Sequence, residues 1–252
     1  MKRKLTTIIG IILILIGLVI AALPYFQSYV MQRQSQQILE LVEEISADEM
    51  EKNQSSEAEH DWSQIENIGF DDFDPITEAL TELNIIEVSR RLNYNKDGTF
   101  RKDQLIGQIV IPDLSINLAL FSGITNGNLL YGVSNMKPNQ KLGERNYAIA
   151  GHIAYSFNTL FTHLPNAKKG MIVRVTDKKN IYYYKIYETK IVDASAVYMV
   201  EDREASKRGN PIISLMSCVP RKNHLRFFAL GDLVDVQPYS NEAMITKEAD
   251  SY

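Results

Sequence analysis

The pattern of apolar and polar positions divides the chain into three stretches of different character. Residues 5–32 carry no charge, and residues 8–23 are almost wholly Ile, Leu, Val, Ala and Gly. A hydrocarbon core about 30 Å thick needs about 20 apolar residues in a helix. The first stretch therefore predicts a transmembrane anchor over residues 5–26, preceded by a short cytoplasmic tail over residues 1–4.

The residues beside this apolar run indicate its orientation. Residues 2–4 are all Lys or Arg, which favours a cytoplasmic N-terminus and an exported body. A cleaved signal peptide is the alternative, with Val19, Ile20 and Ala21 as a cleavage site. The apolar run is longer than the usual 7–15 residues of such a peptide, so we expect an uncleaved, single-pass anchor.

The second stretch, residues 27–100, is acidic and poor in apolar pattern. Residues 40–82 contain fifteen Asp or Glu and one lysine, and such a run repels itself. Apolar residues at near-helical spacing between 38 and 45 predict one amphipathic helix. Asp74 and Pro75 suit the start of another helix, and residues 46–72 between the two predict a disordered spacer. We assign 27–100 to an acidic juxtamembrane linker with helical segments, which either spaces the body from the membrane or covers its active site.

The third stretch alternates in short β-rich runs that end at Gly, Pro, Asn or Ser. This pattern predicts a mainly β domain, a barrel or a sandwich, over residues 101–240, followed by a polar C-terminal tail over 241–252. Nothing in it matches a repeating βαβ unit, a P-loop or a dinucleotide fingerprint. The expected strands are 105–111, 116–121, 147–150, 171–175, 181–192, 212–216 and 225–236, with short helices at 128–133, 157–164 and 194–197.

Charge and cysteine content exclude several classes of function. The formal net charge is −4, and no Arg/Lys stripe offers a nucleic-acid surface. The chain has one cysteine, Cys218, which excludes an intramolecular disulfide and a Cys-rich zinc site. In an exported domain, an unpaired thiol is exposed to oxidation and needs a reason.

Cys218 is the candidate nucleophile. It ends an apolar strand and precedes a polar turn that carries Arg221 and Lys222. Cationic neighbours lower a thiol pKa from about 8.5, and the thiolate is the nucleophile that acyl transfer needs. The alternative is a small, buried and inert cysteine.

Histidine and arginine candidates accompany this thiol. His152 follows a small-residue strand, and Gly151 before it permits a close approach of another segment. His224 is near Cys218 in sequence and competes with His152 for the role of acid and base. His60 suits a linker role, and His163 suits a surface role. Arg226 points to the opposite side of its strand from Phe227, where a guanidinium could stabilise developing carbonyl charge or orient a substrate.

Three motifs taken together resemble the sortases, the cysteine transpeptidases of Gram-positive cell surfaces. They are Ala148-Ile149-Ala150-Gly151-His152, then Ser214-Leu215-Met216-Ser217-Cys218, then Arg226 eight residues later. The resemblance extends over about residues 104–236. The family's usual motif is Thr-Leu-x-Thr-Cys, and in this chain Ser214 and Ser217 replace the two threonines.

The resemblance implies an eight-stranded β-barrel with short helices and a catalytic set of His152, Cys218 and Arg226. It implies that Cys218 attacks the Thr–Gly bond of a Leu-Pro-x-Thr-Gly-like sorting signal on a surface protein and forms a thioester. His152 would then serve as acid and base for the leaving and incoming amines, and the acceptor would be a lipid-linked peptidoglycan precursor. The catalytic domain would be extracellular and anchored to the cell membrane of a Gram-positive bacterium. On the same basis we expect substrate contacts from Ala150, Ser214, Met216 and Ser217.

Subclass, metal dependence and acceptor follow from smaller features. The absence of a second apolar span and of an evident lid favours a class A-like housekeeping enzyme. Some members of that class bind calcium through acids in the loop before the histidine strand, but here residues 135–145 contain Glu144 as their one acid. Glu201, Asp202 and Glu204 could supply only half a site, so we predict no metal, no calcium stimulation and no cofactor. A cysteine peptidase that releases its product to water and a non-catalytic wall-binding module remain the alternatives.

Overall fold

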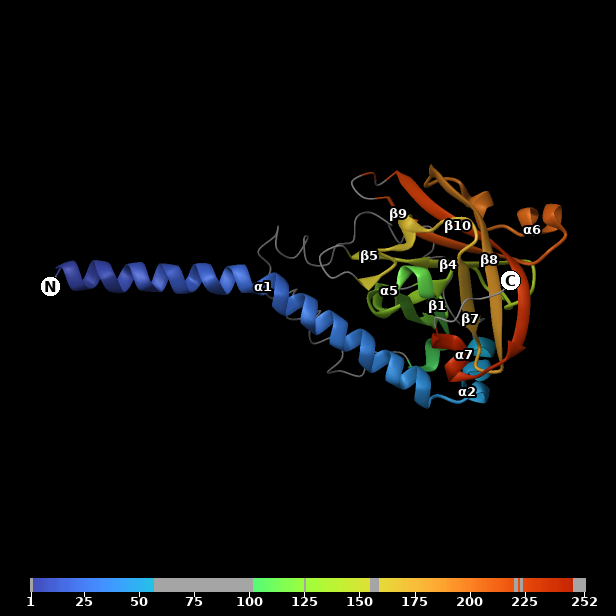
Figure 1. The fold of residues 1–252 in the computed structure, drawn as a ribbon, viewed down its shortest axis with the longest axis horizontal. Coiled ribbons are helices and arrows are strands. Elements are labelled where there is room, and N and C mark those ends of the chain that lie inside the picture. The colour runs from blue at the N-terminus through green and yellow to red at the C-terminus, as the bar shows by residue number, and fades with distance from the viewer. Residues whose placement is uncertain are drawn as a thin grey trace.

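A closed eight-stranded barrel forms the body of the protein (Figure 1). The computed structural model describes residues 2–56, 102–124, 126–154, 159–219, 222 and 224–246. Around the barrel the strand order is β1-β2-β3-β4-β9-β10-β8-β7, and β5 with β6 forms a separate small sheet. The strands are β1 (Leu105–Ile111), β2 (Ile116–Phe121), β3 (Val133–Asn135), β4 (Asn146–Gly151), β5 (Ile153–Ala154), β6 (Thr159–Leu160), β7 (Ile172–Thr176), β8 (Asn180–Asp193), β9 (Ile212–Cys218) and β10 (Leu225–Pro238).

The mainly β, eight-stranded barrel predicted from the sequence is confirmed. Every strand expected from the alternating pattern is present, and the bounds of β1 and β2 match. β3 was not predicted, and the helix expected over 157–164 is wrong where the structure describes it, because residues 159–160 form β6. The short helices of the body are α5 (Asn126–Tyr131), α6 (Arg203–Arg208), α7 (Asn241–Ile245), η3 (Lys102–Gln104), η4 (Pro112–Leu114), η5 (Leu164–Asn166) and η6 (Val197–Met199).

Alternate side chains of each strand face the barrel interior or the outer surface, as the two-residue period requires. On β9, Ile213 and Leu215 join the interior cluster, while Met216 belongs to a second apolar cluster on the outer face. On β4, Ile149 faces inward and Ala148 outward in the same way. The outer cluster of β4, β9 and β10 is partly covered by η6, and it includes two of the predicted site residues, Ala150 and Met216.

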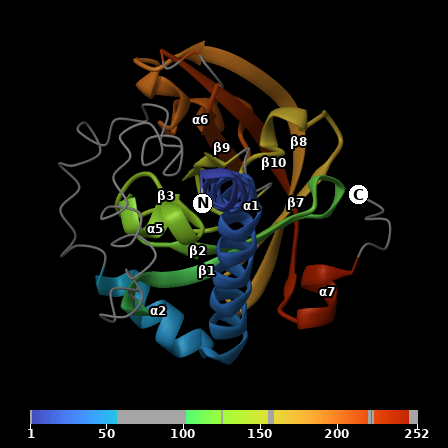
Figure 2. The same cartoon turned by 90° about the vertical axis from the view of Figure 1, so that its left-hand side faces the viewer.

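The N-terminal helix α1 (Lys2–Glu44) is continuous through Pro24, where the sequence predicted an end to the apolar segment. It bends part way along its length in Figure 1, and Pro24 is its one proline, a residue that removes a helix hydrogen bond. Its N-terminal part projects from the barrel, toward the viewer in Figure 2. The predicted span, residues 5–26, lies within α1, but among the described residues no helix combines the length and apolar character needed to cross a membrane.

Residues 46–56 correct the predicted disordered spacer. They form α2 (Ala47–Ser55), whose N-cap Ser46 accepts a hydrogen bond from the Glu49 amide. Met50 packs with the end of α1 against Leu105 and its neighbours on β1 and β2. The acids of α2 face outward, where Glu51 pairs with Lys179 at 2.7 Å. The rest of the expected spacer and the helix expected from Pro75 lie outside the described residues.

The C-terminal segment also packs on the body, where a polar tail was predicted. Met244 of α7 is fully buried against β7 and β8. Arg174 donates from Nη1 to the carbonyl oxygens of Ala243, Met244 and Thr246 at the end of α7, where carbonyl groups lack helical partners. Both views place α2 and α7 at the same end of the barrel (Figures 1 and 2).

Candidate active site

Cys218 and Arg226 lie directly opposite each other on neighbouring strands. Cys218 is the last residue of β9, and Arg226 is the second residue of β10. The antiparallel register pairs their backbones as cross-strand partners. Opposite residues on one face of an antiparallel pair have Cβ atoms about 4.5–5.5 Å apart, so strand pairing starts the two side chains next to each other.

His152 approaches the same point from the other side of β9. β4 runs parallel to β9, with Ala148 opposite Ser214 and Ala150 opposite Met216. β4 ends at Gly151, so His152 directly follows this strand, and Cys218 is the last residue of β9. Three residues that are distant in sequence therefore lie at the same end of three adjacent strands.

Cys218 and Arg226 share the outer face of the sheet. Phe227 belongs to the barrel interior and Phe228 to the outer cluster, so Arg226 lies on the outer face with Cys218. All three are largely covered, with exposed fractions of 4% for His152, 9% for Cys218 and 7% for Arg226. Cys218 is a reduced thiol without a disulfide.

Burial sets the protonation state of the histidine. It lowers the pKa of His152 from 6.5 to about 4, because the imidazolium loses its hydration. At neutral pH the imidazole is therefore neutral and can accept the thiol proton. A neutral base beside a thiol and a fixed cation is an arrangement suited to nucleophilic catalysis.

Close packing holds this histidine in place. A Cβ added at Gly151 would lie 2.6 Å from Phe161 Cδ2 and 2.9 Å from Val133 Cγ1. The Phe161 amide donates to the His152 carbonyl at 2.9 Å. The close approach predicted at Gly151 is thus present, and the phenyl ring of Phe161 makes it.

His224, the competing histidine, lies on the turn between β9 and β10. It is exposed, in contrast to His152. Its carbonyl oxygen accepts a hydrogen bond from the Ala194 amide at 2.8 Å, which ties the start of the β8–β9 segment to this turn. The register of the strands favours His152 over His224 as the partner of the thiol.

The four residues expected to contact a substrate divide between the two faces of the sheet. Ala150 and Met216 lie in the outer cluster with Cys218. Ser214 is on that side as well but is fully buried, and its hydroxyl is bonded to protein. Ser217 lies at a position of β9 that faces the barrel interior. Its hydroxyl has no hydrogen-bond partner among the described residues.

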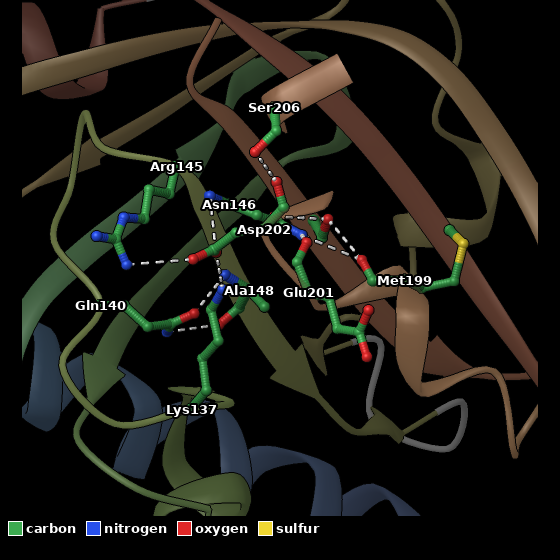
Figure 3. A network of polar contacts seen from close by, with 10 residues as sticks. Lys137, Gln140, Arg145, Asn146, Ala148, Met199, Glu201, Asp202 and Ser206 are labelled. Carbon is green, nitrogen blue, oxygen red and sulfur yellow. Dashed lines mark hydrogen bonds and ion pairs between the residues drawn. The ribbon is translucent and has the colours of Figure 1, made fainter. Parts of the chain in front are cut away.

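A polar network joins β4 to the segment between β8 and β9 (Figure 3). Its centre is Asn146, whose Nδ2 donates to the carbonyl oxygens of Met199 at 3.2 Å and Glu201 at 2.9 Å. Asp202 forms an ion pair with Lys137 and accepts a bond from the Asn146 amide at 3.4 Å. Burial would raise the pKa of Asp202, but the bond and charge of Lys137 outweigh it and hold that pKa below its usual value.

Asn146 was not recognised from the sequence, although a signal was present. Asn146, Ala148, Ala150 and His152 alternate on one side of a strand, and none is a large apolar residue. Small and polar side chains at that period are typical of a face over which another segment packs closely. Among the described residues no group of three His, Cys, Asp or Glu could hold a metal ion. The absence of calcium stimulation stays a prediction.

Comparison with known proteins places this geometry in a family. The family profile "Sortase domain" matches residues 109–234. Sortase A of Listeria monocytogenes is 27% identical over 93% of this chain and 94% of its own length. Sortase A of Streptococcus agalactiae is 31% identical over 79% of this chain and 73% of its own length.

A solved structure agrees with these sequence matches. The crystal structure of Listeria monocytogenes sortase A superposes with a TM-score of 0.50 and 31% identity, covering 55% of this chain and 93% of that one. Residues 109–234, which the family profile matches, include His152, Cys218 and Arg226. The chain therefore belongs to the sortase family, the cysteine transpeptidases that generally act on cell-wall surface proteins.

Proposed function

We propose that this sortase cleaves a Leu-Pro-x-Thr-Gly-like signal between Thr and Gly and transfers the protein to an amine of a lipid-linked peptidoglycan precursor. The observation that carries the proposal is the register of three strands, which pairs Cys218 with Arg226 and sets the end of β4, directly before His152, next to the end of β9. The similarity to proteins named sortase A favours this housekeeping reaction.

The first half of the reaction forms a thioester. His152 is neutral at neutral pH and accepts the thiol proton as Cys218 Sγ bonds to the threonine carbonyl carbon. Arg226 donates to the oxyanion or orients the signal backbone. The C–N bond then breaks, and the imidazolium of His152 gives its proton to the leaving glycine amine.

The second half reverses these roles. The incoming amine attacks the thioester carbon while neutral His152 removes a proton from the nitrogen. The C–S bond breaks, the thiolate of Cys218 leaves and takes the proton back from His152, and a new amide joins the surface protein to the acceptor. Water in place of the amine would make the protein a peptidase, the alternative that the same three residues permit.

We further propose that the protein is held at the cell membrane with its catalytic domain outside a Gram-positive cell. Support comes from the basic residues 2–4, the uncharged residues 5–32 and the exposed apolar side chains between Ile8 and Ile20 on α1. The projecting part of α1 leaves the barrel on the side where β5, which follows His152, is drawn (Figure 1). This geometry suits a substrate and an acceptor that are both held at the membrane.

A peptide assay with and without an acceptor tests the function. The full chain in detergent is incubated with a Leu-Pro-x-Thr-Gly peptide, alone or with triglycine or diaminopimelate. We expect an amide product that requires the amine and disappears with Cys218→Ala. Hydrolysis that no amine affects would identify a peptidase, and slow labelling of Cys218 by iodoacetamide with no turnover would identify a non-catalytic module.

A further inference from the structure

The segment that covers the outer cluster is fixed by contacts that lie away from the reacting atoms. Residues 194–211 connect β8 to β9 and contain η6 and α6. Met199 of η6 packs with Ala148, Ala150 and Met216, the outer-face side chains that lead toward Cys218. The position of this segment therefore sets the space above the strands that present the catalytic residues.

Asn146 and Ser214 hold η6 against the sheet from below. They stand near the starts of the parallel strands β4 and β9, and both are fully buried. Ser214 Oγ donates either to Asn146 Oδ1, at 2.8 Å, or to the Met199 carbonyl, at 3.2 Å. Asn146 Nδ2 bonds the carbonyl oxygens of Met199 and Glu201. Buried bonds of this kind cost about 1–3 kcal/mol each to leave unmade, so the arrangement is well determined.

Two further contacts fix residues 194–211, one at the start of this segment and one in its middle. The Ala194 amide donates to the carbonyl of His224, two residues before Arg226. Asp202 pairs with Lys137, which lies on the segment between β3 and β4, and with Arg145 at 3.5 Å (Figure 3). The segment is thus tied to the catalytic turn at its start and to β4 at its middle.

We propose that Asn146 and Ser214 are positioning residues for the sorting signal: they hold η6 at a fixed height over Ala148, Ala150 and Met216, so that the wall that receives the signal is formed before it binds. The proposal rests on the proposed function. It gives Ser214 a role different from the direct substrate contact expected from the sequence, since its hydroxyl is bonded to protein. A preformed wall avoids the cost of ordering a loop on binding, so its loss raises KM more than it lowers kcat.

The test compares four variants of the full chain in detergent with the Leu-Pro-x-Thr-Gly peptide and triglycine. Asn146→Ala removes the two donors and the acceptor, and Ser214→Ala removes one hydroxyl. Ser214→Thr keeps that hydroxyl, and Ser206→Ala removes an exposed serine hydroxyl from the same segment. Folded enzyme is quantified by its far-UV circular dichroism and the amplitude of its thermal unfolding, so that a loss of folded protein is not read as a kinetic effect.

We expect KM for the peptide to rise about tenfold or more in Asn146→Ala and several-fold in Ser214→Ala, with kcat per folded enzyme within about threefold of wild type. Ser214→Thr and Ser206→Ala should keep the wild-type KM. Peptide affinity measured with Cys218→Ala as the background should fall in parallel when Asn146→Ala is added.

Other results would overturn the proposal. A fall in kcat at unchanged KM would place Asn146 in the chemical step, and equal effects of Ser214→Thr and Ser214→Ala would show that the hydroxyl is not what matters. If Asn146→Ala does not fold, the two Ser214 variants decide alone. Wild-type turnover with unchanged KM in all variants refutes the positioning role only, whereas no wild-type turnover refutes the proposed function itself.

Discussion

Arg226 illustrates how one residue can be assigned by strand register. Its backbone pairs with that of Cys218 across the ladder, and its Nη1 donates to the Leu225 carbonyl at 2.9 Å. We predict that Arg226→Ala lowers kcat/KM by about 10² or more, the scale of a lost oxyanion donor. Arg226→Lys should keep only part of the wild-type kcat/KM, since an ammonium group lacks the planar, two-pronged donor geometry of a guanidinium. Steady-state kinetics with peptide and triglycine give the comparison.

The matched control for this prediction is His224→Ala. His224 is exposed on the turn beside Arg226, and we expect its loss to change kcat/KM by no more than about threefold. A larger loss in His224→Ala than in His152→Ala would transfer the acid–base role to the turn. The assignment of His152 would then be wrong.

The buried imidazole of His152 makes stability depend on pH in a defined window. The pKa of His152 is about 4 in the folded protein and about 6.5 in the unfolded chain. Between these values the unfolded chain binds a proton that the folded protein does not, so stability falls as pH falls from 6.5 to 4. The loss from this one group is on the order of 3 kcal/mol. Urea unfolding at pH 7 and pH 4 measures it.

A glutamine at this position isolates the effect. His152→Gln has no titrating ring, so its loss of stability between pH 7 and pH 4 should be smaller than that of wild type. His163→Gln, which removes a histidine outside the site, should keep the wild-type loss. Equal losses of stability between pH 7 and pH 4 in wild type and His152→Gln would mean that the imidazole of His152 is protonated at pH 4 in the folded protein as well.

At the scale of one element, the end of β4 depends on a glycine. Ala at position 151 would meet Phe161 and Val133 inside ordinary contact distance. We predict that Gly151→Ala destabilises the protein by about 1–3 kcal/mol, the usual cost of overpacking. It should also lower kcat/KM, because the displaced segment carries His152. Thermal unfolding and the peptide assay measure the two effects.

A second substitution tests whether that contact is the cause. Phe161→Leu makes room beside position 151, so the double variant should recover part of the stability lost in Gly151→Ala. The two substitutions should therefore couple. Strict additivity would place the strain elsewhere, for instance in the backbone of β5.

Single elements also show what the sequence could and could not predict. β1 and β2 were placed correctly because Pro112 and the Ser122-Gly123 pair interrupt clear apolar runs. β3 has three residues, too few for a period, and it is fixed by pairing with β2 and β4. The motifs predict the set of Cys218, His152 and Arg226, and their catalytic roles stay a prediction. The role proposed for Asn146 was missed, because its partners are backbone carbonyls of a segment more than fifty residues away.

At the scale of the whole molecule, the arm formed by residues 38–56 was predicted only in its first half. The amphipathic helix expected from residue 38 is present at the end of α1, but the charge count wrongly predicted disorder from residue 46. The sequence shows the acids of this arm but not their partners, which come from distant parts of the chain. Glu49 lies 3.5 Å from Lys102 and Glu51 lies 2.7 Å from Lys179. These exposed pairs add little stability alone. Asn53, however, is buried and donates to the carbonyl oxygens of Lys102 and Leu105. The arm is therefore part of the body, fixed to β1 and to the turn before β8.

The extent of that body can be tested by truncation. Ile38, Val42, Ile45 and Met50 are buried against side chains of β1, β2 and α5. Burying such a side chain stabilises by about 1.5–3 kcal/mol before the entropy of ordering is subtracted. A fragment of residues 57–252 should therefore melt roughly 5–10 °C below one of residues 34–252. Val42→Asp in the longer fragment should lower the melting temperature similarly, since it buries an unpaired charge, whereas Glu44→Ala on the exposed side should not. Equal melting temperatures for the two fragments would return residues 38–56 to the role of a spacer.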